Sequence, residues 1–363
     1  MNDLLIQGCE EQVRNVFQKA LDGERISEKE ALILFKEAEL ASLSYVADII
    51  RKRLNGSVLY FVKNYHIEPT NRCIHNCKFC SFSERISRTG WSFSFDEMME
   101  MVRQLKTDIT ELHIVGGVNP KYDLDFFCRL LEQIKKEKPE LHIKAFTAVE
   151  LDYIITQSGL TFEEGLKRLK VSGLDSIPGG GAEIFNPEIR KQICSSKTGA
   201  EDWLKIHKIA HQCGIPSNAT MLYGFFETYE DRVDHLSQLR KLQDKTKGFN
   251  AFIPLKFKNK NNEFSHVPEL SVVEEMKNYA ISRIFLDNIQ HLKVYWPMTG
   301  LENSRMSLHF GVDDFDGTID DSTRIYEMAG SIENPTLNSV EIEKIALEEG
   351  LQAVERDGAY NKL

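Results

Sequence analysis

The sequence predicts an α/β fold of the (β/α)8 type, in which parallel strands close into a TIM-like barrel. Short apolar runs alternate with amphipathic, helix-like segments along most of the 363 residues. Eight such runs can be counted, and several end in glycine, as at Gly116-Gly117 and Gly179-Gly180. The carboxyl ends of barrel strands carry the active site, so we expect functional residues there.

The composition is that of a globular protein and argues against several functional classes. Hydrophobic residues make up 42% and charged residues 28% of the chain, close to the averages for soluble domains. The net charge is −10, so we expect no nucleic-acid partner, which would require clustered basic residues. The sequence shows no signal-peptide pattern and no apolar run approaching 18 residues. We therefore expect no membrane association and a cytoplasmic location.

Residues 1–58 predict a helical extension before the barrel. Ser27 and Glu30 have the spacing of a capping box, and an apolar stripe follows at helical spacing. A second stripe runs from Leu43 to Ile50, and Asn55-Gly56 ends it.

The barrel itself is predicted at residues 59–317. Several intervening segments begin with capping boxes, at Ser94, Thr161 and Ser271. The eight predicted strands are residues 65–69, 112–116, 142–147, 176–179, 217–224, 251–257, 291–296 and 308–312. Residues 318–363 predict a C-terminal helical extension packed on the barrel, with an amphipathic segment at 342–351 and a polar tail.

Three of the seven cysteines form the most informative motif. Cys73, Cys77 and Cys80 have the spacing Cys-x3-Cys-x2-Cys directly after the first predicted strand. Three thiolates on one loop can bind three irons of a [4Fe–4S] cluster, which usually takes four cysteines. No fourth cysteine lies nearby, so the fourth iron would be open to another molecule, as in catalytic zinc sites.

Two other interpretations of the cysteines remain open from the residues alone. A structural zinc could take His75 or His66 as its fourth ligand. Cys77 and Cys80 could form a thioredoxin-type redox pair, which would leave Cys73 unexplained. Metal analysis separates these classes, because a full cluster contains about four irons and a structural site one zinc.

The cysteine motif, with Phe79 directly before the third cysteine, resembles the signature of the radical S-adenosylmethionine superfamily. The resemblance implies a radical SAM barrel that binds a [4Fe–4S] cluster through Cys73, Cys77 and Cys80. It also implies S-adenosyl-L-methionine as a co-substrate at the open iron. One electron from a donor such as flavodoxin or ferredoxin then releases a 5′-deoxyadenosyl radical.

Further segments are most similar to the aminodeoxyfutalosine synthase family of the menaquinone-pathway branch. The resemblance covers roughly residues 57–360 and includes segments 66–71, 144–150, 173–183, 218–224 and 313–318. The third strand separates the sister families. Cyclic dehypoxanthinyl futalosine synthases typically read His-Ala-Phe-Ser-Pro-Pro-Glu there, whereas this chain has Lys-Ala-Phe-Thr-Ala-Val-Glu.

The family resemblance implies the reaction as well. The substrate would be the small molecule 3-[(1-carboxyvinyl)oxy]benzoate, whose vinyl ether carbon receives the adenosyl radical. Migration of the aryl group and loss of a carboxylate as bicarbonate would give 6-amino-6-deoxyfutalosine. The alternative is the cyclic dehypoxanthinyl futalosine synthase reaction, in which the radical abstracts a hydrogen atom and the product cyclises.

Candidate site residues follow from the resemblance and from the predicted strand ends. In the superfamily a Gly-Gly pair meets the methionine amino group, and Thr147 and Glu150 are in position to meet the ribose or the methionine carboxylate. The expected cofactor-binding residues are Phe79, Gly116, Gly117, Thr147 and Glu150.

The two substrate carboxylates need cations or amide donors, and a glycine run can form an anion nest. The expected substrate residues are Ser176, Gly179, Gly180, Lys256 and Arg305, with Lys144, Lys293 and His291 as further cations. The expected catalytic residues, for radical control and proton transfer, are His66, Glu68 and Tyr223.

Overall fold

Eight strand positions close into a parallel barrel in the computed structural model, which describes residues 3–321, 328 and 336–363. The first position is divided into β1 (Val58–Val62) and β2 (Asn64–Ile67), and the last into β8 (Asp314–Gly317) and β9 (Asp320–Asp321). Between them come β3 (Glu111–Ile114), β4 (His142–Ala145), β5 (Ser217–Tyr223), β6 (Phe249–Lys256) and β7 (His291–Leu292).

The strand pairings join these positions into a ring. β2 pairs with β3, β3 with β4, β5 with β6, and β6 with β7, all in parallel. Single bridges at Ser176 and Ile177 supply the fourth position, between β4 and β5. A bridge from Lys293 to Asp314 connects β7 to β8, and β8 pairs with β1. The predicted (β/α)8 architecture is confirmed.

The eighth strand was predicted at the wrong segment. Residues 308–310 form the 3-10 helix η1 (Leu308–Phe310), which continues α15 (Leu301–Ser307). Gly311 then adopts a left-handed conformation with φ 96°, and β8 begins three residues later. Leu308 and Phe310 are buried in the helical layer. A short buried apolar run has no periodicity that distinguishes a helix from a strand.

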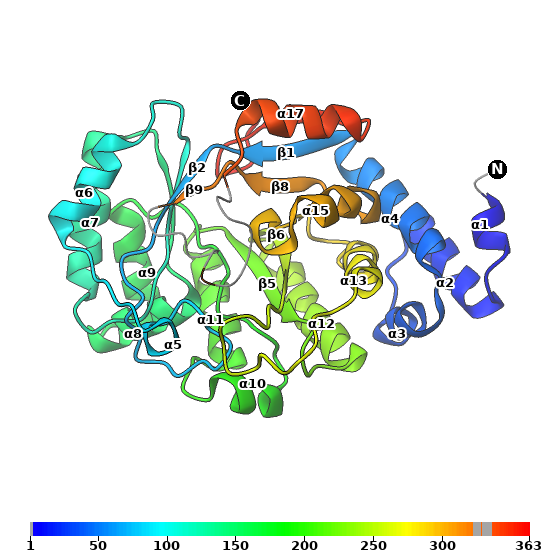
Figure 1. Cartoon of the computed structure of the whole chain (residues 1–363), viewed down its shortest axis with the longest axis horizontal. Helices are drawn as coiled ribbons and strands as arrows, with labels where there is room; N and C mark the ends of the chain where they lie inside the picture. The colour runs from blue at the N-terminus through cyan, green and yellow to red at the C-terminus, as the bar shows by residue number, and fades with distance from the viewer. Residues whose placement is uncertain (1–2, 322–327, 329–335) are drawn as a thin grey trace.

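Helices surround the barrel, as Figure 1 shows. Capping boxes start α6 and α9 at Ser94 and Thr161, as predicted, whereas Ser271 caps α13 through its hydroxyl bond to the Glu274 N–H. The helices of this layer are α5 (Glu84–Ser87), α6 (Phe95–Gln104), α7 (Leu124–Glu137), α8 (Ala148–Gln157), α9 (Phe162–Val171), α10 (Pro187–Cys194), α11 (Ala200–Gln212), α12 (Tyr229–Thr246), α13 (Val272–Phe285) and α14 (Trp296–Thr299). No helix of the described ranges is long and apolar enough to cross a bilayer.

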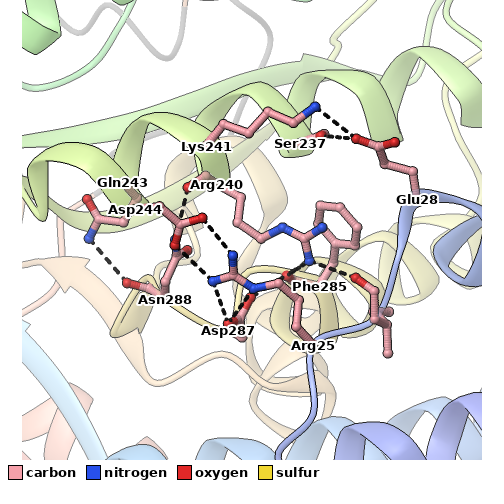
Figure 2. A network of polar contacts seen from close by, with 11 residues as sticks. Arg25, Glu28, Ser237, Arg240, Lys241, Gln243, Asp244, Phe285, Asp287 and Asn288 are labelled. Atoms are coloured by element: carbon pink, nitrogen blue, oxygen red, sulfur yellow. Dashed lines mark hydrogen bonds and ion pairs between the residues drawn. The ribbon is translucent and has the colours of Figure 1, made fainter.

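The N-terminal helices pack on one side of the barrel wall (Figure 1). They are α1 (Asp3–Gln7), α2 (Glu11–Leu21), α3 (Glu28–Glu37) and α4 (Leu40–Asn55), and α3 and α4 contact α12 and α13. Figure 2 shows the polar contacts of the segment before α3. There Arg25 reaches Asp244 at 2.6 Å and Asp287 at 2.8 Å, and Arg240 donates to the Ile26 carbonyl at 2.9 Å.

The C-terminal segment contains a strand that the sequence did not predict. After α17 (Ser339–Glu348), β10 (Gln352–Glu355) pairs in parallel with β1, where the sequence predicted a polar tail. Arg356, which follows it, is buried and forms a 2.7 Å ion pair with Asp314 of β8. Gly358 packs so closely on His142 that a Cβ there would lie 2.2 Å from the ring. The chain terminus therefore fills the amino end of the barrel beside β1 and β4.

Candidate active site

A cavity of about 150 Å³ lies inside the barrel. Its wall combines polar side chains with apolar ones from facing strands. It is lined by His113, Val115, Lys144, Thr147, Pro178, Gly180, Asn218, Thr220, Ile253, Leu255, Tyr295 and Asp316. Strand side chains alternate between two faces, so the even-numbered residues of β5 and the odd-numbered residues of β6 point inward.

The three motif cysteines lie on one loop between β2 and α5. The Cys73 Sγ accepts hydrogen bonds from the N–H groups of Val118 at 3.3 Å and His75 at 3.5 Å. Burial raises the pKa of the Cys80 thiol to about 11 and also raises the pKa of Cys77, and the neighbouring cysteine charges act in the same direction. In the absence of a metal these two thiols are therefore protonated near neutral pH, because burial disfavours the thiolate.

This donor set fits an iron–sulfur cluster. The cysteines of a [4Fe–4S] cluster each bind a different iron, so they need not converge on a single ion. Within the described residues, no three His, Cys, Asp or Glu side chains could hold one metal ion together. The N–H bonds to the Cys73 sulfur are of the kind that tunes cluster thiolates. The residues present therefore suit the cluster that the motif implies.

Gly116 and Gly117 lie where the cysteine loop crosses the end of β3. A Cβ on Gly117 would lie 2.7 Å from the Arg72 carbonyl oxygen, and one on Gly116 would lie 2.9 Å from that of Thr70. The Gly117 N–H also donates to the Thr70 carbonyl at 2.7 Å. The sequence predicts that these glycines allow a ligand to approach the backbone closely. The structure gives a second reason for glycine at both positions, because a side chain there would collide with the cysteine loop.

Thr147 and Glu150 form the capping box that begins α8. The Glu150 carboxylate accepts the Thr147 N–H at 2.7 Å and the Gly116 N–H at 3.0 Å. Glu150 is buried, and burial raises its pKa to about 7 in spite of these hydrogen bonds. Thr147 lines the cavity, whereas Glu150 links the start of α8 to the glycine pair.

His66 and Glu68 are both buried near the carboxyl end of the first strand. The His66 Nε2 lies 3.3 Å from the Asn64 amide, and its ring packs edge-on against His113 at 4.5 Å between centroids. Burial lowers the pKa of His66 to about 4, so its imidazole is neutral near pH 7. The Glu68 carbonyl accepts the Trp91 indole N–H at 2.9 Å. Phe79 is half-buried, with the Lys197 ammonium 5.7 Å from its ring centroid.

The glycine run after the fourth strand position faces the cavity at Gly180. Gly179 has φ 86°, and a Cβ there would lie 2.1 Å from the Asn218 carbonyl oxygen. Its own carbonyl accepts the Thr220 hydroxyl at 2.7 Å. Ser176 is bridged to Lys144, but its hydroxyl is 2.7 Å from Nε2 of His142, the first residue of β4. The Ser176 hydroxyl is therefore directed toward the amino end of β4, and Ser176 is not among the residues that line the cavity.

Three expected site residues point away from the cavity, which corrects the assignment made from strand ends. Tyr223 and Lys256 lie on the outer faces of β5 and β6, because Thr220 and Leu255 point inward. Lys256 forms a 3.0 Å ion pair with Glu275 of α13. The Tyr223 ring lies 5.3 Å from the Arg232 guanidinium of α12. Arg305 of α15 forms ion pairs with Glu348 and Glu349, each at 2.9 Å.

Other cations named from the sequence are held by buried carboxylates. Lys144 lines the cavity and pairs with Glu111, and Lys293 pairs with Asp316 at 2.7 Å. His291 lies 2.6 Å from Asp313. The sequence reasoning missed the cavity residues His113, Asn218, Thr220 and Asp316. The strand alternation would have indicated the first three, whereas Asp316 has a positive φ of 64° that no pattern predicts.

Comparison with known proteins identifies the family. The model of the radical SAM superfamily matches residues 67–239, and that of the CofH/MqnC C-terminal region matches residues 246–362. An aminodeoxyfutalosine synthase of Thermus thermophilus is 39% identical over 96% of this chain and 95% of its own. The chain belongs to the radical SAM superfamily. A cyclic dehypoxanthine futalosine synthase of Streptomyces coelicolor is 33% identical over 96% of this radical SAM chain and 88% of its own.

A solved structure shares the fold. The hydrogenase maturase HydG superimposes with a TM-score of 0.77 at 15% identity, covering 96% of this chain and 77% of that one. This radical SAM chain is an enzyme, and it uses a [4Fe–4S] cluster and S-adenosylmethionine as the superfamily does. The zinc and dithiol interpretations of the cysteine motif are no longer needed.

Proposed function

We propose that this radical SAM enzyme is an aminodeoxyfutalosine synthase of menaquinone biosynthesis. It would join the adenosyl group of S-adenosylmethionine to 3-[(1-carboxyvinyl)oxy]benzoate to give 6-amino-6-deoxyfutalosine, with methionine released and a carboxylate lost as bicarbonate. The observation that carries the proposal is the 39% identity to the Thermus thermophilus aminodeoxyfutalosine synthase, which extends over 96% of this chain. The relative with the cyclase name is 33% identical.

The third barrel strand supports this choice between the two families. Segment 144–150 has the form of the synthases, with lysine first where cyclases typically have histidine. Lys144 and Thr147, which differ between the two forms, both line the cavity. A difference in the cavity wall changes what the cavity can bind, whereas a surface difference would not.

Cofactor binding is assigned to the cysteine loop and the neighbouring strand ends. Cys73, Cys77 and Cys80 would hold the cluster, and Gly116, Gly117, Thr147 and Phe79 would contact S-adenosylmethionine. When bound, the cluster and S-adenosylmethionine would supply a 5′-deoxyadenosyl radical for addition to the vinyl ether carbon of the substrate. Glu150 positions this region, because its carboxylate fixes the Gly116 and Thr147 N–H groups.

The barrel residues would bind and orient the substrate. Ile253 and Leu255 give the cavity an apolar wall suited to an aromatic ring, and Lys144 adds a cation for a carboxylate. Gly180 presents the glycine run to the same space. His66 is neutral near pH 7, so it would donate or accept a hydrogen bond without adding charge.

The remaining assignments stay predictions. They are a helical extension at residues 1–58, the barrel at 59–317 and a C-terminal extension at 318–363, a cytoplasmic location, and an external one-electron donor such as flavodoxin or ferredoxin. We expect no nucleic-acid partner.

A product mass spectrum tests the proposal. The protein is reconstituted without oxygen, reduced, and given S-adenosylmethionine with 3-[(1-carboxyvinyl)oxy]benzoate. We expect a new ion that joins the adenosyl and aryl-carboxylate parts less one carboxylate. If a protein with about four irons per chain yields 5′-deoxyadenosine alone, the proposed substrate is wrong. The dehypoxanthinyl futalosine substrate of the cyclase is then tested in its place.

A further inference from the structure

Three basic side chains lie side by side across neighbouring barrel strands. The register aligns His66 of β2 with His113 of β3, and His113 with Lys144 of β4. His113 and Lys144 both line the cavity. Neither the family matches nor the sequence motifs assign a role to His113, the central residue of this layer.

Its neighbours already have polar partners, whereas the Nε2 atom of His113 has none among the described residues. Lys144 pairs with Glu111, and Asp316, which also lines the cavity, pairs with Lys293. The Asn64 amide lies 3.3 Å from the His66 ring. The His113 Nε2 is buried and has no hydrogen-bond partner in the described part of the chain. A buried polar atom without a partner is destabilising, so such an atom beside a cavity points to a bound ligand.

The surroundings define the chemical class of that ligand. Burial and the adjacent Lys144 charge hold the pKa of His113 well below its usual value, so the imidazole is neutral and has one N–H to donate. Lys144 lines the cavity, and its ammonium group has N–H donors beyond the one that bonds Glu111, so it can also bind an anion. Ile253 and Leu255 line the same cavity. An aromatic ring bearing a carboxylate meets these conditions.

We propose that His113 is a substrate-binding residue that donates a hydrogen bond to a carboxylate of the aromatic substrate. The carboxylate lies beside the Lys144 ammonium, and the ring lies against Ile253 and Leu255. The identity of that substrate rests on the proposed function, whereas the subsite for an aromatic carboxylate does not.

The methionine carboxylate of S-adenosylmethionine has the same chemistry, and position decides between the two sources. His113 precedes Gly116 by three residues, which along an extended strand is roughly 10 Å. The cysteine loop packs against Gly116 and Gly117, so it lies roughly 10 Å from His113 along β3. The carboxylate at His113 therefore belongs to the aromatic substrate.

Steady-state kinetics of two variants test the proposal. His113→Phe removes the donor, so KM for the aromatic substrate is expected to rise roughly 10- to 100-fold, the range for a hydrogen bond to a charged group. His113→Gln keeps an amide donor, so a smaller rise is expected. KM for S-adenosylmethionine and the iron content stay unchanged in both. His142→Asn, on the next strand but bonded to Ser176 and not lining the cavity, is the matched control and keeps the wild-type KM.

Three results would overturn the assignment. The first is an unchanged KM for the aromatic substrate in His113→Phe. The second is a rise in KM for S-adenosylmethionine, and not for the aromatic substrate, in His113→Phe, which would show that His113 binds S-adenosylmethionine. The third is an equal rise in His142→Asn, which would show a general disturbance of the barrel.

A binding measurement separates this proposal from the proposed function. Calorimetry with benzene-1,3-dicarboxylate is carried out on the reconstituted, unreduced enzyme with S-adenosylmethionine present. We expect binding to wild type that weakens in His113→Phe and persists in His142→Asn. If wild type forms no product yet shows this binding pattern, the subsite stands and the proposed function fails. Equal binding by wild type and His113→Phe would refute the subsite.

Discussion

Burial controls the protonation of the side chains around the cysteine loop and the cavity. It raises the pKa of Glu150 to about 7 and that of Cys80 to about 11, and it lowers the pKa of His66 to about 4. Each shift disfavours the charged form, because the surroundings solvate charge poorly. The cysteines consequently become thiolates when a metal binds, and metal binding releases their protons.

Cys80→Ser tests the ligand assignment at the residue scale. Losing one of three thiolates should abolish stable cluster binding, so iron content falls and turnover drops by more than about 100-fold. Cys213→Ser is the control, because Cys213 follows α11 and is remote from the motif. Iron analysis and product formation are measured on both variants. Full iron content in Cys80→Ser would contradict the assignment.

Tyr223→Phe tests the corrected position of Tyr223. Its hydroxyl is buried without a hydrogen-bond partner in the described residues, and it lies in the helical layer outside the barrel. Removing an unpartnered buried hydroxyl should leave kcat and KM unchanged and should not lower stability. Kinetics and thermal unfolding check this. A large loss of kcat with an intact cluster would restore the catalytic role that the sequence suggested.

At the scale of the element, the start of α8 couples helix capping to the glycine pair. Glu150 stabilises the helix terminus and accepts the N–H of Gly116 at the end of β3. One carboxylate therefore fixes the relative position of two strand ends beside the cysteine loop.

The raised pKa of Glu150 makes this element sensitive to pH. The folded-state pKa is about 7 and the ordinary value is 4.5. Between these values the folded chain keeps a proton that the unfolded chain releases. The resulting stabilisation is complete below pH 4.5 and is lost as the pH rises to 7, by about 3 kcal/mol.

Glu150→Gln should remove this dependence. The difference in unfolding free energy, variant minus wild type, should increase between pH 5 and pH 7.5. Urea unfolding of the metal-free chain at several pH values measures it, and any constant cost of the amide cancels in the comparison. A difference that does not change with pH would contradict the raised pKa.

The sequence could predict most elements, because apolar runs, capping boxes and glycine ends are local signals. It could not separate η1 (Leu308–Phe310) from a strand, since both bury a short apolar run. It missed β10 because Gln352–Glu355 is short, contains only two apolar residues and is only partly buried. The motif cysteines could be named from their spacing. Lys256 was misassigned because a strand end has two faces, and only the register shows which one faces the cavity.

At the scale of the whole molecule, the N-terminal and C-terminal segments both pack against the barrel. The N-terminal helices pack on α12 and α13, and β10 with Arg356 fills the amino end. The cysteine loop and the cavity lie toward the carboxyl ends of the barrel strands, which these segments leave free to bind cofactor and substrate. The division separates parts that stabilise the fold from parts that carry the chemistry.

Arg25→Ala tests how firmly the N-terminal helices are attached (Figure 2). Arg25 pairs with Asp244 and Asp287, and all three side chains are about 40% exposed, so solvent screens the interaction. We expect the unfolding free energy to fall by about 1 kcal/mol in low salt and by less in high salt, with KM unchanged. Lys36→Ala, which breaks a single exposed pair with Glu230, should have a smaller effect. An equal fall in unfolding free energy in both variants would show that pairing with two carboxylates gives Arg25 no more stabilisation than a single exposed ion pair gives.

The central claim is that the adenosyl group becomes part of the product. The most direct measurement uses S-adenosylmethionine carrying carbon-13 at the 5′ position, with 3-[(1-carboxyvinyl)oxy]benzoate, and nuclear magnetic resonance of the product. We predict that the labelled carbon is bonded to a carbon that comes from the vinyl ether. Label found only in 5′-deoxyadenosine would contradict the account.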